Sequence, residues 1–157
     1  MIEKIYHTFV YGGIKEASGK ITDSIGRSKS DVRKWATGKG ARGTLREAIT
    51  EYTVRGVIGG EMGRGSTEEG TFSFVECRPK TGRTHQIRVH MKSINHPIVS
   101  DTLYAEKRNK SENQLGFTRL ALHARMLSFT DLLGETVSIT APYPADFEKA
   151  LEILGQS

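Results

Sequence analysis

β-Branched and aromatic residues, in approximate alternation with polar ones, mark several short stretches of this chain, and such a pattern is typical of β-strands. We expect strands at residues 4–11, 19–27, 48–58, 71–78, 121–130 and 135–142. The glycine-rich stretch 59–70 predicts a hairpin tip between the third and fourth strands, and Gly134 predicts a turn between the last two. Hairpin connections of this kind indicate antiparallel pairing.

Two segments show the helical period instead. Ile87, Met91 and Ile94 recur at helical spacing, and Thr84 is a candidate N-cap for this helix. A second helix is expected over residues 145–154, with three apolar side chains on one face: Phe147, Leu151 and Leu154. Because strands outnumber helices, the sequence predicts an α+β fold, a mixed and mainly antiparallel sheet with flanking helices.

Two polar segments separate these elements. Residues 28–45 are basic and contain glycines, so we expect a long loop with one helical turn, anchored by Trp35. Residues 106–114 are expected to form a charged loop. The chain of 157 residues shows no repeat and no linker, and we expect one domain over residues 1–157.

The composition is that of an ordinary globular domain, with 36% hydrophobic and 26% charged residues. The single cysteine, Cys77, excludes an internal disulfide and suits a reducing compartment. No apolar run approaches the ~20 residues that span a bilayer, and the first residues do not form a signal peptide. We therefore expect a cytoplasmic protein that does not bind membranes.

Basic residues exceed acidic ones by 23 to 18, giving a net charge of +5. Seven basic residues lie in the segment from Arg27 to Arg46, which contains a single acidic residue, Asp31. They are Arg27, Lys29, Arg33, Lys34, Lys39, Arg42 and Arg46. A charge run taken alone indicates a solvated loop. A second basic cluster at residues 78–92 favours a different interpretation, in which both segments line one groove for a polyanion.

The second basic cluster also carries the most specific motif. TGRTHQIRVH at residues 81–90, followed by HPIVSDTLY at 96–104, resembles the RluA-type RNA pseudouridine synthases. Four further stretches match that family in the same order, so that the resemblance covers nearly the whole chain: KIYHTFVYG, GKITDSIGRS (the family's hairpin), AITEYTV and LALHA.

The resemblance implies isomerisation of uridine to pseudouridine in structured RNA, either rRNA or tRNA, without cofactor or metal. In the family a catalytic aspartate lies in an HRLD-type segment upstream of the strand that corresponds to residues 4–11. That segment is not found in this sequence, so we expect a catalytic domain without its aspartate, inactive alone. We also expect an exposed sheet edge or apolar face beside residues 4–11, where the chain associates with the missing segment or with itself.

The resemblance assigns roles to individual residues. Arg88 corresponds to the arginine that pairs with the catalytic aspartate, and Tyr6 to the tyrosine that packs on the target base. Leu122 and Val89 are expected to line the substrate pocket. From residue type alone, Arg88 also suits phosphate binding or coverage of the helix surface, and Tyr6 and Leu122 suit a core. Asp101 is expected to accept hydrogen bonds from backbone N–H groups in a turn.

RNA contacts are expected from both basic segments, at Arg83, Thr84, His85, Arg27, Arg33, Lys34, Lys39 and Arg42. Thr84 equally suits a helix cap, and Gly82 simply permits a turn. The histidines at 85, 90, 96 and 123 have no zinc-like spacing with the single cysteine, so we expect no metal site. Two other functions stay open, namely a non-catalytic RNA-binding module or subunit of a split enzyme, and a basic β-rich nucleic-acid binder.

Overall fold

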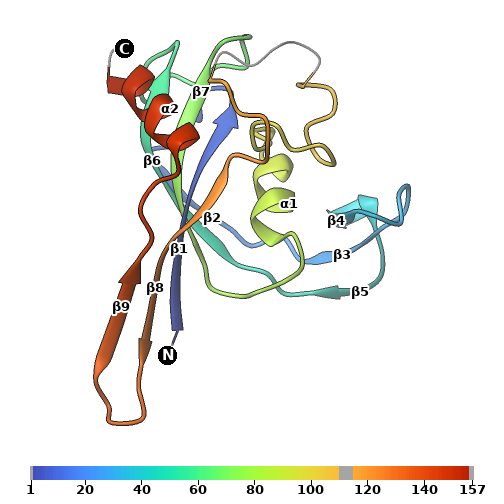
Figure 1. Cartoon of the computed structure of the whole chain (residues 1–157). Coiled ribbons are helices and arrows are strands. Elements are labelled where there is room, and N and C mark those ends of the chain that lie inside the picture. Colours follow the sequence, from blue (N-terminus) through green and yellow to red (C-terminus); the bar gives the residue numbers. More distant parts are fainter. Residues whose placement is uncertain (1, 110–114, 156–157) are drawn as a thin grey trace.

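A six-stranded sheet forms the centre of the computed structural model, which describes residues 2–109 and 115–155 (Figure 1). Its strand order is β2-β6-β7-β1-β8-β9, and all its pairings are antiparallel. The strands are β1 (Ile2–Tyr11), β2 (Ser18–Ile21), β6 (Thr50–Ile58), β7 (Phe72–Pro79), β8 (Leu122–Thr130) and β9 (Thr136–Thr140). The predicted α+β class and the β6–β7 hairpin are confirmed.

A second, three-stranded sheet of order β4-β3-β5 lies beside the first one. It consists of β3 (Ile25–Ser28), β4 (Trp35–Thr37) and β5 (Ala41–Arg46), with a 3-10 turn at Gly38–Gly40. The expected loop at 28–45 is therefore wrong apart from its single helical turn. Its backbone N–H and C=O groups pair with β3, which the charged and glycine-rich composition of the segment does not indicate.

Residues 19–27 do not form the single strand that the sequence predicted, nor the hairpin that the resemblance implied. The chain leaves β2 after Ile21 and enters β3 at Ile25, and the two strands belong to different sheets. At the break, the carbonyl of Asp23 accepts a hydrogen bond from Nε2 of His90 at 2.8 Å. The backbone thus changes partners where a distant histidine holds it.

Helix α1 (Gln86–Ser93) packs against the large sheet through Ile87 and Met91, as the helical spacing predicted. The prediction of Thr84 as its cap is wrong, because the helix begins later and His85 occupies the N-cap position in a left-handed conformation, φ 54°. Helix α2 (Ala145–Gly155) confirms the second helical segment and buries Phe147 and Ala150.

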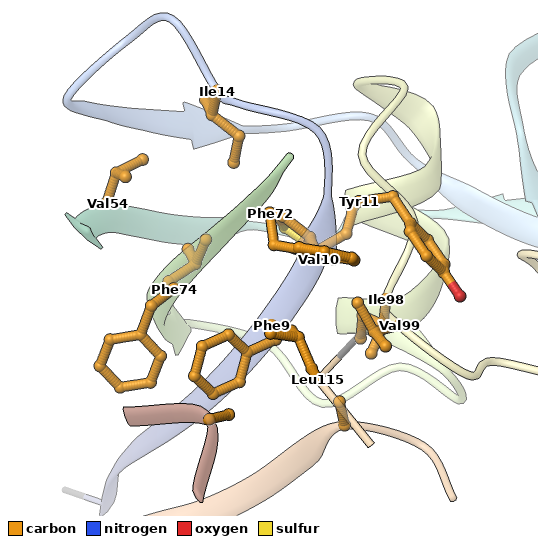
Figure 2. Close-up of a cluster of buried hydrophobic side chains, with 14 of the residues drawn as sticks. Phe9, Val10, Tyr11, Ile14, Val54, Phe72, Phe74, Ile98, Val99 and Leu115 are labelled. Atoms are coloured by element: carbon orange, nitrogen blue, oxygen red, sulfur yellow. The ribbon is translucent and has the colours of Figure 1, made fainter. Parts of the chain in front are cut away.

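The core lies around the C-terminal end of β1, at Phe9, Val10 and Tyr11 (Figure 2). Successive strand residues point to opposite faces of a sheet. Phe9 is fully buried against Phe147 of α2, with ring centroids 5.6 Å apart, whereas Tyr6 lies on the α1 side in a cavity described below. Within the described ranges, no helix is long and apolar enough to cross a membrane.

The expected sheet edge beside residues 4–11 is wrong, because β1 lies between β7 and β8 and pairs with both. The edges of the large sheet are β2 and β9. Large apolar side chains are exposed instead around the protruding β8–β9 hairpin and the start of β1: Ile2, Leu127, Leu132, Leu133 and Ile139. Part of the loop expected at 106–114, residues 110–114, lies outside the described residues.

Candidate active site

A cavity of about 240 Å³ opens where β1, β8 and α1 meet the turn that follows β7. Tyr6 comes from β1, Arg88 from α1 and Leu122 from β8, and all three line this cavity. Arg83 and His85 line it as well. The fold therefore brings together, from distant parts of the chain, most of the residues that the sequence pattern singled out.

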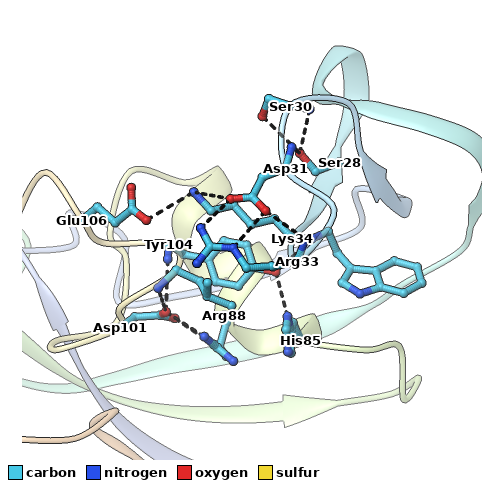
Figure 3. A network of polar contacts seen from close by, with 12 residues as sticks. Ser28, Ser30, Asp31, Arg33, Lys34, His85, Arg88, Asp101, Tyr104 and Glu106 are labelled. Carbon is cyan, nitrogen blue, oxygen red and sulfur yellow. Dashed lines mark hydrogen bonds and ion pairs between the residues drawn. The ribbon is translucent and has the colours of Figure 1, made fainter.

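Arg88 is held in place by a buried carboxylate (Figure 3). Its Nε donates to Oδ2 of Asp101 at 2.9 Å, and its Nη2 donates to Oδ1 at 2.8 Å. Oδ1 also accepts the backbone N–H groups of Leu103 and Tyr104, as the turn prediction for Asp101 required. Among the described residues, the second terminal nitrogen of Arg88, Nη1, has no hydrogen-bond partner, so a further acceptor can bind there.

Tyr104 connects this ion pair to the small sheet. Its ring lies under the Arg88 guanidinium, with 5.1 Å from Cζ to the ring centroid. Its hydroxyl oxygen is 2.8 Å from Nδ1 of His85 and 3.0 Å from the backbone nitrogen of Trp35 in β4. Tyr104 was not predicted from the sequence, because only the fold brings β4 and α1 to the same hydroxyl.

Gln86 fixes the turn that leads into α1, and it was not predicted from the sequence either. Its Oε1 accepts hydrogen bonds from the Thr81 hydroxyl and the Arg83 backbone N–H. Its Nε2 donates to the carbonyl of Ile49 and to Thr50 Oγ1. The signal available in the sequence was an amide side chain close to a glycine-containing turn. If such an amide is buried, it requires hydrogen-bond partners.

A second cavity, of about 440 Å³, lies on the small sheet. Arg27, Arg42 and Arg46 line it together with Gly82, Arg83 and Thr84. Gly82 and Arg83 line the first cavity as well, so the two hollows adjoin at this turn. Residues of both basic segments therefore line adjoining cavities, and their use as one groove for a polyanion stays a prediction.

The other basic residues of this segment lie differently. Arg33 pairs with Asp31 at 2.7 Å, and the half-buried Lys34 lies within 4 Å of Asp31 and of Glu106. Lys39 is exposed in the 3-10 turn. Arg83 donates from Nε to the carbonyl of Glu47 at 2.8 Å, which fixes its guanidinium at the turn.

Val89 does not lie among the residues that line the first cavity, contrary to the expectation. It is buried in a separate apolar cluster with Ile25, Ala48 and Tyr104. The helical period explains the difference: Val89 follows Arg88 directly, and adjacent residues of a helix point in different directions. No group of three metal-ligand side chains is found in the described part of the chain.

Each aspartate of the chain has a structural role in the described residues. Asp101 is 1% exposed and both of its oxygens accept hydrogen bonds. Asp31 and Asp146 pair with arginines, and Asp131 accepts backbone N–H groups in the β8–β9 turn. The backbone of Asp23 binds His90. None of these five lines the Arg88 cavity.

Comparisons with known proteins identify the family of this chain. The family model of the RNA pseudouridylate synthases matches residues 1–93. The chain is 37% identical to an uncharacterized RNA pseudouridine synthase of Synechocystis sp. and 37% identical to the ribosomal large subunit pseudouridine synthase D of Neisseria meningitidis serogroup B. Both matches cover 98% of this chain, but only 42% and 39% of the relatives, so the chain spans less than half their length.

The fold comparison gives the same family. The human RNA pseudouridylate synthase domain containing 1 aligns with a TM-score of 0.75 and 27% identity, over 91% of this chain and 55% of that structure. A second human structure, the RNA pseudouridylate synthase domain containing 4, aligns with a TM-score of 0.68 at 21% identity and supports the fold. The chain belongs to the RNA pseudouridylate synthase family, and within it to the RluA type.

Proposed function

We propose that this chain supplies the RNA groove and one wall of the active site of an enzyme that converts uridine to pseudouridine in structured RNA. The observation that carries the proposal is the cavity in which Tyr6, Arg88 and Leu122 converge. An aromatic ring, a cation and an apolar side chain suit a nucleotide that has left its stack. No cofactor or metal is required by this proposal.

In this proposal the nucleophile is an aspartate that is not among these 157 residues. We place it in a segment that corresponds to the part of the relatives that this chain does not span. Arg88 would bind that aspartate through Nη1 while Asp101 keeps its other edge. A carboxylate beside a guanidinium stays ionised, because the opposite charge lowers its pKa. Tyr6 would pack on the target base.

The β9 edge is the place where we propose that a further segment associates. β9 reads TVSIT, without charge or proline, and its outer side has no partner strand among the described residues. An uncharged edge strand is a template for β-pairing. A second copy of this chain is the alternative occupant. Association with the aspartate-bearing segment predicts activity for the pair, whereas self-association predicts an inactive dimer.

The RNA in this proposal is structured rRNA or tRNA, and the relative from Neisseria, a ribosomal large subunit pseudouridine synthase, makes large-subunit rRNA the first candidate. The adjoining cavities with Arg27, Arg42, Arg46 and Arg83 supply the phosphate contacts. The compartment that fits such a role is the cytoplasm.

The experiment is pseudouridine-specific chemical mapping of bulk RNA after incubation with the protein. Residues 1–157 alone are expected to leave the RNA unchanged, and the same chain with an aspartate-bearing segment, added covalently or in trans, is expected to form pseudouridine. Activity of the completed protein that survives both Arg88→Ala and Tyr6→Phe would overturn the assignment of this site.

A non-catalytic RNA-binding module is the second candidate, and one observation favours it. Arg88 already has a two-bond carboxylate partner within the chain, so its position does not depend on a catalytic aspartate. This function predicts tight binding of structured RNA and no pseudouridine under any complementation. The mapping experiment therefore separates the two candidates.

A further inference from the structure

His85 occupies an unusual place at the edge of the Arg88 cavity. It is the N-cap of α1, with φ 54° and ψ 22°, a left-handed conformation that few non-glycine residues adopt. Such backbone outliers gather at functional sites, where the surrounding structure holds them. Here the turn directs the imidazole edge toward Tyr104 on one side and leaves the ring in the cavity wall with Tyr6 and Arg88.

The hydrogen bonds of the Tyr104 hydroxyl determine which nitrogen of His85 carries the proton. The backbone N–H of Trp35 donates to the hydroxyl oxygen at 3.0 Å, so that oxygen is already an acceptor. The phenol has one proton to donate, and within the described ranges Nδ1 of His85, at 2.8 Å, is its acceptor. When the phenol donates its proton in this way, Nδ1 is unprotonated and the proton of the neutral imidazole lies on Nε2.

The surroundings keep both groups in these states. Burial raises the pKa of Tyr104, so the phenol retains its proton at neutral pH. Burial, followed by the positive charge of Arg88, lowers the pKa of His85 and keeps the ring neutral. Nε2–H of His85 has no hydrogen-bond partner among the described residues, although the ring lines the cavity.

A neutral donor at this position suits a neutral acceptor. The cavity is also lined by cations, namely Lys4, Arg83 and Arg88. Arg88 already has a carboxylate partner and Arg83 donates to the carbonyl of Glu47, whereas Tyr6, Ile87 and Leu122 offer mainly ring and apolar surface. A phosphate oxygen prefers a cationic donor. The uncharged carbonyl of a base can instead be recognised by a neutral donor such as His85. Uracil presents a carbonyl oxygen, O4, where cytosine presents an amino group, which is itself a donor.

We propose that His85 donates a hydrogen bond from Nε2 to O4 of the uracil in the cavity, and that Tyr104 is the positioning residue that fixes the required tautomer. His85 would then distinguish uridine from cytidine, because a fixed donor cannot pair with an amino group. The identity of the base rests on the proposed function, whereas the tautomer rests on the geometry alone.

The test is NMR of residues 1–157 labelled with ¹⁵N in the histidine rings. At neutral pH, His85 is expected to show an unprotonated Nδ1 and a protonated Nε2. His90 is an internal control with the same tautomer, since Nδ1 lies 2.7 Å from the Thr50 hydroxyl and Nε2 binds the Asp23 carbonyl. Uridine monophosphate should shift the Nε2 resonance of His85 and leave that of His90 in place.

Two further probes identify the atom that His85 contacts. Cytidine monophosphate should shift the His85 resonance much less than uridine monophosphate does, and inorganic phosphate should not shift it. Equal shifts with both nucleotides, a shift with phosphate alone, no shift with uridine monophosphate, or a proton on Nδ1 would each overturn the proposal.

Variants test the role of Tyr104. Tyr104→Phe removes the donor to Nδ1, so His85 is expected to populate both tautomers and the preference for uridine over cytidine monophosphate should fall by about fivefold, the value of one hydrogen bond. His85→Leu should abolish the preference. An unchanged tautomer and preference in folded Tyr104→Phe would refute the positioning role, and the measurements on the unmodified chain decide the rest.

The failure of this inference is distinguishable from failure of the proposed function. Binding of structured RNA with His85 protonated on Nδ1 refutes the inference alone. The expected tautomer and nucleotide preference, in a chain that binds no structured RNA and forms no pseudouridine when completed, refutes the proposed function alone.

Discussion

Arg88 and Asp101 form a two-bond ion pair in which the arginine faces the cavity and the aspartate is buried behind it. The two hydrogen bonds measure 2.9 and 2.8 Å, and the exposed fractions of the two side chains are 18% and 0%. The pair joins α1 to the loop after it, since Asp101 also binds the backbone of Leu103 and Tyr104. One carboxylate thus organises both the cation and the turn that carries Tyr104.

Loss of Asp101 is expected to destabilise the fold strongly. Asp101→Ala leaves Arg88 partly buried without a partner, and removal of one member of a buried pair costs about 3–5 kcal/mol. Asp101→Asn should cost less, because an amide oxygen can still accept the backbone N–H groups. Urea unfolding measures both. Asp31→Asn is the matched control, since the Arg33–Asp31 pair lies at the surface and should contribute little. Equal losses from Asp101→Ala and Asp31→Asn would contradict this view.

Stability is expected to fall as the pH drops below neutrality, because burial lowers the pKa of four histidines in the folded chain: His7, His85, His90 and His96. A histidine whose folded pKa lies below its ordinary value, about 6.5, binds fewer protons than the unfolded chain does in that interval. The contribution of such a neutral histidine to the free energy of unfolding is complete above the ordinary pKa, and it is lost as the pH falls through the folded pKa.

Urea unfolding at a series of pH values measures this effect. His90→Gln removes a fully buried histidine of this set. It should lower the free energy of unfolding above neutral pH and make its fall with decreasing pH shallower. A free energy of unfolding that stays constant from about pH 8 to about pH 5, the interval in which histidines titrate, would contradict the histidine account.

The sequence predicted the elements whose own residues carry a period. The alternation in β1, the β6–β7 hairpin and the apolar spacing of Ile87 and Met91 depend on side chains that meet one core, so a local pattern is sufficient. The small sheet was missed because β3, β4 and β5 are held by pairing between segments that are polar and rich in glycine. Local composition does not encode such pairing.

RNA affinity is expected to depend on the arginines of the groove rather than on basic charge in general. Arg42→Gln combined with Arg83→Gln removes two cations from the second cavity and should lower the slope of log K against log[salt] by roughly one unit for each phosphate that the protein no longer binds. Arg33→Gln combined with Lys34→Gln removes equal charge from residues that already pair with Asp31, and should change the slope less. Equal slopes for the two double variants would contradict the claim that Arg42 and Arg83 bind RNA phosphates.

Gly82 is expected to matter for binding and not for folding. A Cβ atom at this position would meet no other heavy atom within 4 Å, and Gly82 is not among the residues with positive φ. Because the position is open, Gly82→Leu should leave the unfolding free energy almost unchanged, within about 0.5 kcal/mol. Gly82 lines both cavities, so the added side chain should obstruct them and weaken RNA binding. Unaltered binding, or a large loss of stability, would show that the glycine serves only the turn.

The candidate site divides in a similar way between what the sequence predicted and what it did not. Arg88, Tyr6 and Leu122 were found from motif positions, and the fold brings them to one cavity. Tyr104 was missed because its hydroxyl forms hydrogen bonds with residues 69 and 19 positions away. Gln86 was missed because its amide joins the adjacent turn to Ile49 and Thr50, which are 37 and 36 positions away. Val89 was misplaced because one step along a helix changes the direction of a side chain by about 100°.

The most direct test is pseudouridine formation by the completed enzyme and its Arg88 variant. Pseudouridine-specific chemical mapping should detect no product with residues 1–157 alone and clear product once an aspartate-bearing segment is supplied. Arg88→Ala should then reduce the rate by roughly a hundredfold, because a displacement of a catalytic group by about 1 Å can cost that factor. Arg64→Ala, at an exposed arginine that pairs with Glu61 outside the cavity, should retain full activity. Turnover by residues 1–157 alone, or an Arg88→Ala rate equal to that of Arg64→Ala, would contradict the proposed site.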